Sequence, residues 1–118
     1  MALYFENLTA WKKAFLLTEK VHTLIKEFPK EEQFALTDQM RRSSLSIVSN
    51  IAEWSGRGGN AEYAHFLHIA KWSCMELYTQ VLLADKFGYI KNQDEKQEII
   101  SLCEEVIKIL YTLAKSKQ

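Results

Sequence analysis

The sequence predicts an all-α protein folded as an up-down-up-down antiparallel four-helix bundle. Apolar residues recur at spacings of three and four over long stretches, as on one face of a helix. The single proline and the four glycines fall between these stretches. No segment alternates with period two over a useful length, so no sheet is expected. The 118 residues suit one domain spanning residues 1–118, long enough to bury a core without disulfides or metal.

The first helix is expected over residues 8–28. Its apolar stripe is predicted to consist of Leu8, Trp11, Phe15, Thr18, Val21, Ile25 and Phe28. Pro29 pushes the residue before it out of helical geometry and so ends the helix.

The second helix is expected over residues 37–57, with Thr37 as its N-cap and Asp38 in its first turn. Gly58 and Gly59 end it. The third helix is expected over residues 60–87, with Asn60 as its cap. Short connections make consecutive helices antiparallel.

The fourth helix is expected over residues 93–115. Asn92 to Glu95 read as a capping-box-like start. The inner stripe is predicted to consist of Ile99, Leu102, Val106, Ile109 and Leu113.

The third helix carries more apolar surface than one inner stripe needs. A bundle helix normally shows an apolar stripe and a polar back, but here apolar residues go most of the way round. Contiguous exposed apolar surface of this kind indicates a partner surface. The predicted oligomer interface comprises Trp54, Trp72, Met75, Tyr78 and Leu82. The alternative is a wide inner face with scattered surface hydrophobes.

Small and polar residues also line the second and third helices at matching depths on either side of Gly59. A structural polar network is therefore predicted, in which a charge-assisted Arg42–Glu76 pair sets the register of the two helices. The network pairs Ser46 with Ser73, Gln39 with Gln80, and Glu53 with His65, and it includes Asn50.

The formal charge balances, with 15 basic and 15 acidic residues, which does not favour a dedicated nucleic-acid binder. Six dispersed cations are ordinarily a solvated face, but a ring of identical subunits would repeat them and make phosphate binding more plausible. The candidate nucleic-acid contacts are Arg41, Arg57, Lys12, Lys13 and Lys71, with Arg42 beside them.

No catalytic site, cofactor or metal is predicted. Glu19 with His22 and Glu62 with His65 resemble the Glu-x-x-His pairs of di-iron bundles. The two pairs are expected at depths that differ by ~13 Å, whereas the ligands of one ion lie within ~2 Å of it. Cys74 and Cys103 fall in amphipathic stretches and are expected to be reduced core thiols, with a disulfide as the minority alternative.

No apolar run reaches the ~18 residues of a membrane span. The first residues also lack the basic and apolar regions of a secretion signal. We therefore expect neither a membrane partner nor export.

The chain resembles the 23S rRNA-intervening sequence proteins, often called four-helix bundle proteins. The likeness covers nearly the whole chain. Its most specific block runs from Leu36-Thr37-Asp38-Gln39-Met40-Arg41-Arg42-Ser43-Ser44 to Ser49-Asn50-Ile51-Ala52-Glu53. Further matches are Leu8 to Ala14, Phe28 to Glu32, Gly56-Arg57, Phe66 to Ala70, Glu76-Leu77, Thr79-Gln80 and Phe87 to Ile90.

The resemblance implies a cytoplasmic bacterial protein that assembles with itself into a ring, typically a pentamer. A related group is similar to the accessory protein of diversity-generating retroelements, a basic barrel that binds nucleic acid and a reverse transcriptase. The balanced charge of this chain departs from that group. Trp54 and Trp72 also depart from the family pattern, which has glycine at both positions.

From these observations we expect a non-enzymatic homo-oligomeric interaction module that binds RNA or a nucleic-acid-processing protein. The alternative is a purely protein-binding scaffold without a nucleic-acid role.

Overall fold

A computed structural model describes residues 3–116, so the ends of the predicted range 1–118 lie outside it. Within the described residues the chain forms four α-helices and no strand, which confirms the predicted class. The helices are α1 (Thr9–Leu24), α2 (Leu36–Gly56), α3 (His65–Lys86) and α4 (Gln93–Ser116). The short 3-10 turn η1 (Tyr4–Asn7) precedes α1. Further 3-10 turns lie between α1 and α2, at η2 (Ile25–Glu27) and η3 (Lys30–Glu32), and between α2 and α3, at η4 (Ala61–Tyr63).

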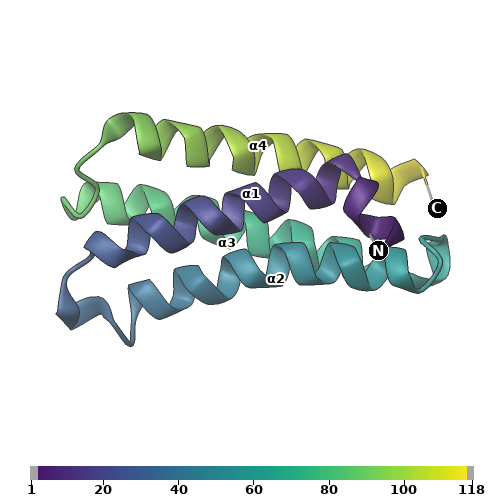
Figure 1. Cartoon of the computed structure of the whole chain (residues 1–118), viewed down its shortest axis with the longest axis horizontal. Coiled ribbons are helices and arrows are strands. Elements are labelled where there is room, and N and C mark those ends of the chain that lie inside the picture. Colours follow the sequence, from purple (N-terminus) through teal and green to yellow (C-terminus); the bar gives the residue numbers. More distant parts are fainter. Residues whose placement is uncertain (1–2, 117–118) are drawn as a thin grey trace.

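The helices run alternately up and down (Figure 1). Each packs against the next along the chain, and α4 returns to α1, so the bundle closes around one core. It measures 41 × 30 × 25 Å. None of the helices formed by residues 3–116 is long and apolar enough to cross a membrane.

The inner stripe of α1 differs from the prediction. Its buried residues are Ala10, Ala14, Leu17, Val21 and Leu24. Phe15 was predicted to point inward but is 47% exposed. The two alanines explain the difference, because small residues on the inner side let α1 approach its neighbours closely and turn the larger ring outward.

The helix ends follow local chemistry only in part. Asn92 does cap α4, since its Oδ1 accepts hydrogen bonds from the Asp94 and Glu95 amides at 2.9 and 3.2 Å. Thr37 is not the cap of α2, which begins at Leu36 after Ala35. The Thr37 hydroxyl is instead buried and has no hydrogen-bond partner in the described part of the chain.

The connection between α2 and α3 is longer than predicted. Asn60 caps the short turn η4 by accepting from the Glu62 amide at 3.2 Å, and α3 begins only at His65. Gly59 has a φ of +61°, a conformation open to glycine without strain. This loop folds back over the end of α2 and covers Trp54.

Candidate interaction surface

The contact between α2 and α3 is partly polar. The Ser73 hydroxyl donates to Ser46 Oγ at 2.7 Å, so these two residues meet as predicted. Asn50 Nδ2 donates to the Ser46 carbonyl at 2.8 Å and to its Oγ at 3.1 Å. The three residues therefore form one connected set that fixes the register of α2 against α3.

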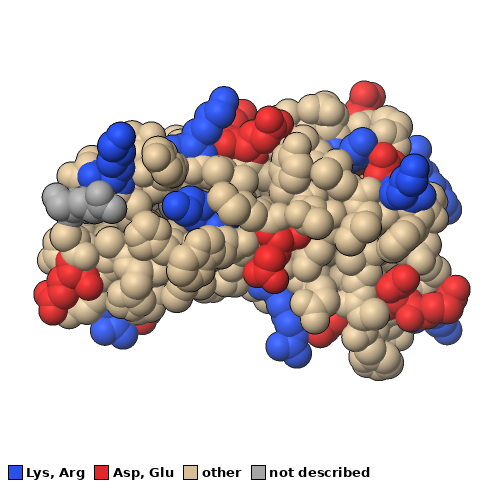
Figure 2. Space-filling model, turned by 180° about the vertical axis from the view of Figure 1, so that it is seen from behind, with Lys and Arg blue, Asp and Glu red and all other residues tan. Residues whose placement is uncertain are grey.

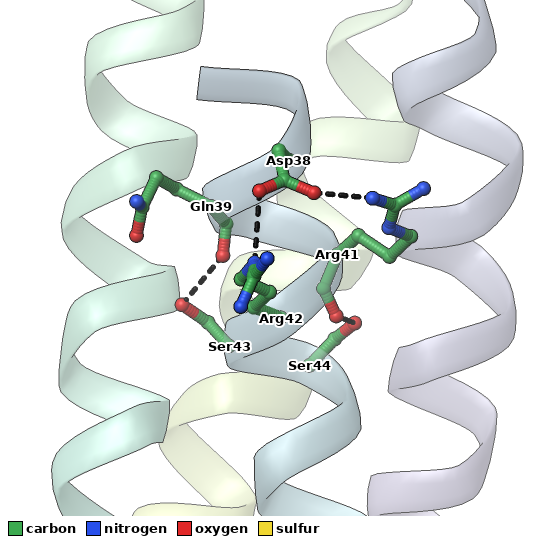
Figure 3. Close-up of polar contacts among 6 residues, drawn as sticks. All are labelled: Asp38, Gln39, Arg41, Arg42, Ser43 and Ser44. Carbon is green, nitrogen blue, oxygen red and sulfur yellow. Dashed lines mark hydrogen bonds and ion pairs between the residues drawn. The ribbon is translucent and has the colours of Figure 1, made fainter. Parts of the chain in front are cut away.

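A second polar contact lies nearer the start of α2. The Ser43 hydroxyl is 2.9 Å from the Gln39 carbonyl and 3.0 Å from Gln80 Oε1. Figure 3 shows Ser43 beside the Gln39 carbonyl. Gln39 and Gln80 are thus linked through Ser43, a buried residue that the sequence interpretation did not single out.

The predicted Arg42–Glu76 pair is wrong. Arg42 Nε donates to Asp38 Oδ2 at 2.8 Å, one turn earlier in α2, and Arg41 donates to the other oxygen of the same carboxylate (Figure 3). Glu76 is exposed and joins no ion pair within residues 3–116. A partner four residues away on the same helix requires less ordering of a long side chain than one on a neighbouring helix.

These two arginines stabilise the charged form of the Asp38 carboxylate. The hydrogen bond from Arg42 contributes most to lowering its pKa, and the bond from Arg41 adds to the effect. The pKa of Asp38 therefore lies below its ordinary value, and the shift has a structural explanation within one helix turn.

Glu53 likewise does not pair with His65 as predicted. It accepts from Arg57 at 3.0 Å, again one turn away. The Arg57 guanidinium also lies over the rings of Tyr63 and Phe66, at 5.6 and 5.3 Å from their centroids. His65 packs on Phe66 instead, with ring centroids 4.1 Å apart. These contacts order the loop between α2 and α3.

The candidate nucleic-acid contacts do not form one basic surface. Lys13 pairs with Glu105 across α1 and α4 at 2.5 Å. Lys71 lies over the Tyr111 ring on the side of α3 and α4, at 5.3 Å. Arg41 and Arg57 belong to α2 and its end, and Lys12 is exposed on α1. Figure 2 shows the basic and acidic groups scattered over the face it presents.

The outer face of α3 is an exposed apolar surface. It carries four large side chains that are 43 to 58% exposed: Trp72, Met75, Leu82 and Leu83. We call this set the α3 outer face. In Figure 2, where α3 is turned toward the reader, uncharged surface dominates. Trp72, Met75 and Leu82 of the predicted interface are therefore available to a partner.

Trp54 does not belong to that surface. It is 4% exposed, and its indole N–H donates to the Asn60 carbonyl at 3.1 Å. Its ring lies under Gly59, where an added Cβ would come within 3.6 Å of it. Tyr78 is half-buried against the core and contributes only part of its ring. The fold of the loop over α2, which sequence periodicity cannot show, removes Trp54 from the interface.

A second apolar feature, missed at the sequence level, lies between α1 and α2. A groove of about 390 Å³ is lined by Phe15, Thr18, Glu19, His22, Thr23, Leu45 and Val48. Phe15 and Leu45 are each 47% exposed. We call it the α1–α2 groove. The sequence does carry a signal for this groove. Because Ala10 and Ala14 lie on the inner side of α1, its large apolar residues outnumber those that the core can hold.

Within residues 3–116 no group of three or more His, Cys, Asp or Glu side chains is placed to hold a metal ion. Cys74 and Cys103 are buried in the core and are not linked to each other. The Cys74 thiol donates to the Cys103 carbonyl at 3.6 Å. The hydrogen bond with Cys103 and then burial raise the pKa of Cys74, so the thiol stays protonated and weakly nucleophilic.

Comparisons with known proteins agree on the fold. The family model of the 23S rRNA-intervening sequence protein matches residues 6–112. A solved structure from Bacteroides thetaiotaomicron VPI-5482, described as a protein of unknown function from the S23 ribosomal protein family, superposes with a TM-score of 0.80. It is 23% identical and covers 91% of this chain and 99% of its own. No curated protein matches the chain.

Proposed function

The chain belongs to the 23S rRNA-intervening sequence protein family, and from that premise we propose that it is a non-enzymatic, homo-oligomeric interaction module of the bacterial cytoplasm. In this proposal the subunits form a ring, with the pentamer as the expected size. The working surface of the protein is then the assembled ring rather than a pocket in one chain.

The α3 outer face carries the proposal. Its four large apolar side chains follow one side of a single helix and remain about half exposed within residues 3–116. Monomeric proteins rarely expose contiguous apolar surface of this kind. Covering each half-exposed side chain contributes on the order of 1 kcal/mol to the free energy of association. Four such side chains on one helix therefore favour association substantially.

The titratable groups support a non-enzymatic role. The groups with shifted pKa values are Asp38, Asp85, Tyr89 and Cys74, and each shift has a structural partner as its cause. Active sites gather such groups in one cleft. Here they lie in different parts of the bundle: the start of α2, the α3–α4 corner and the core.

For the partner of the ring we favour RNA or a protein that acts on nucleic acid. Arg57 is half-exposed at the loop between α2 and α3, and a ring would present one copy per subunit. Repetition converts weak single contacts into useful avidity. The competing function is a scaffold that binds only proteins, and the neutral net charge favours it.

Native mass measured by multi-angle light scattering tests the assembly. We expect the wild type to be oligomeric at micromolar concentration and the Met75→Glu variant to be smaller, because a buried unpaired carboxylate opposes association. Circular dichroism checks that both chains remain helical. A wild-type chain that runs as a monomer under these conditions removes the proposal.

A further inference from the structure

We infer that the α3 outer face of one copy inserts into the α1–α2 groove of the next, so that the ring is held by a head-to-tail contact between two unlike faces. The inference rests on the proposed function, which requires self-association but does not say which surfaces meet. The occupant of both surfaces is thus a second copy of this chain.

Symmetry requires two unlike faces. A contact that uses the same patch on both partners is two-fold and closes at a dimer, whereas a ring of three or more like subunits repeats one heterologous contact. Each copy must therefore carry a donor face and a different acceptor face. The α3 outer face projects from the bundle, and the α1–α2 groove is hollow and has an apolar lining.

Two other sides of the bundle are poorer acceptors. The side between α1 and α4 is crossed by two ion pairs, Lys13–Glu105 and Lys20–Glu98, each 2.5 Å long. Covering them would desolvate charges that water now stabilises. The contact between α2 and α3 is lined by serine and amide groups that already bond one another.

The register of the helices can be read from two contacts. The Thr18 hydroxyl lies 3.1 Å from the Ser44 carbonyl, so residue 18 of α1 and residue 44 of α2 lie at the same depth in the bundle. The Ser73 hydroxyl lies 2.7 Å from Ser46 Oγ, so residue 73 of α3 and residue 46 of α2 also lie at the same depth. Counting along the antiparallel helices from these contacts gives the depth of any residue in the bundle at ~1.5 Å per residue.

Two of the four residues of the α3 outer face lie at the depth of the groove's apolar residues. Phe15 on α1 is level with Trp72 on α3, and Leu45 on α2 is within one residue, ~1.5 Å, of the level of Met75. Rotation about an axis parallel to the helices keeps depth unchanged. Such a rotation therefore brings Trp72 and Met75 of the α3 outer face to the apolar residues of the neighbour's α1–α2 groove. By the same count Leu82 and Leu83 are level with the start of α2, ~12 Å from the level of Leu45.

A pair of opposite charges also fits this arrangement. Glu76 lies on the side of α3 that faces α2, one turn before Gln80, which contacts α2. In a rotational ring that side of the inserted α3 meets α2 of the neighbouring copy, where Arg41 stands one turn before Leu45. By the same count Arg41 is within two residues, ~3 Å, of the level of Glu76. Arg41 and Arg42 share the single carboxylate of Asp38, so one positive charge remains for Glu76.

Area and direction are adequate for a stable contact. A side of the bundle 41 Å long and 25 Å wide offers about 1,000 Å², and standard interfaces bury ~800 Å² per partner. The two faces are not diametrically opposed, because α3 lies diagonally across from α1 while the groove lies between α1 and α2. Successive copies therefore turn relative to one another, as a closed ring requires.

Two variants that each spoil one face test the inference by complementation. Leu45→Glu keeps an intact α3 outer face, and Trp72→Glu keeps an intact α1–α2 groove. We expect each variant alone to be monomeric by light scattering, and an equimolar mixture to contain particles with the mass of two chains, because one wild-type contact can form between them. Leu16→Glu, an equally exposed leucine on the side between α1 and α4, is the matched control and should leave the wild-type mass unchanged.

The outcomes separate the inference from the proposed function. If Leu45→Glu keeps the wild-type oligomer, the groove is not the acceptor and the inference is wrong, while the ring survives. The inference is also wrong if both variants are folded monomers that fail to associate when mixed. A monomeric wild type overturns the proposed function itself. Circular dichroism melts of both variants establish that a loss of mass is not a loss of fold.

Discussion

At the scale of single residues, the two tryptophans Trp54 and Trp72 have opposite roles. Trp54 is buried under the loop between α2 and α3 and donates its indole N–H to the Asn60 carbonyl. Trp72 is 58% exposed on the α3 outer face and stacks against His68, with ring centroids 6.2 Å apart. The first contributes to the stability of the chain and the second to its surface.

Replacing Trp54 by alanine should lower the free energy of unfolding by about 3–5 kcal/mol, because it removes a large buried ring and leaves a cavity under Gly59. Chemical denaturation followed by circular dichroism, on samples dilute enough to be monomeric, measures this loss. Trp72→Ala is the matched control and should change the same quantity by less than about 0.5 kcal/mol. Equal losses in the two variants would contradict the assignment of Trp54 to the core.

At the scale of elements, the α3–α4 corner is held by one carboxylate. Asp85 near the end of α3 accepts from Gln93 at 2.8 Å and pairs with Lys96 at 2.9 Å, both in the first turns of α4. The bond from Gln93 and then that from Lys96 lower the pKa of Asp85. Gly88, with a φ of +82°, makes the turn that brings the two helices together.

Asp85→Asn should therefore lower the melting temperature at neutral pH and lose its effect in acid. The folded pKa lies below the unfolded value of about 4, so the stabilisation is complete above pH ~4 and is lost as the pH falls through the folded pKa. The melting temperatures of the wild type and of Asp85→Asn, measured from pH 7 downward, show this loss. The two melting temperatures should converge at low pH. Asp94→Asn, which removes a carboxylate from the first turn of α4 itself, controls for the helix dipole. A difference that does not shrink as the pH falls below ~4 would count against the ionic contact.

At the scale of the whole molecule, formal charge is balanced, its groups are scattered, and six of the 15 Lys and Arg residues lie in ion pairs within residues 3–116. Arg42 and Arg57 pair within one turn of α2, and Lys13 and Lys20 pair across α1 and α4. A single chain is therefore a poor phosphate-binding surface. A ring would repeat whatever cations remain free around one axis, and this repetition is what a nucleic-acid role depends on.

If the ring binds structured RNA, the affinity should fall with salt, with a slope of about −0.7 to −0.9 for each phosphate contact. Fluorescence anisotropy over a salt series measures the slope, and Arg57→Gln should make it shallower. Lys20→Gln is the control, because it removes a cation from the side between α1 and α4, away from the loop that carries Arg57. Absence of binding at low salt would favour the alternative, a scaffold that binds only proteins.

Much of the candidate surface could be predicted from the sequence, and the failures share one cause. Trp72, Met75 and Leu82 were found because they exceed what one inner stripe can hold. Phe15, Trp54 and Arg42 were misplaced. The first two lie at the border between the inner and outer sides of a helix, or beside a loop, where spacing along the chain cannot say which side packs. Arg42 is long enough to reach several carboxylates.

The sequence by itself determined the all-α class, the number and order of the helices and the start of α4, because periodicity and capping act between residues a few positions apart. It also determined that Ser46 meets Ser73, since a short turn sets the register of a hairpin. Only the tertiary structure decided the rotation of α1, the burial of Trp54, the partners of the arginines and the presence of the α1–α2 groove. These depend on how whole helices pack, and small residues such as Ala10 and Ala14 control that packing from within the core.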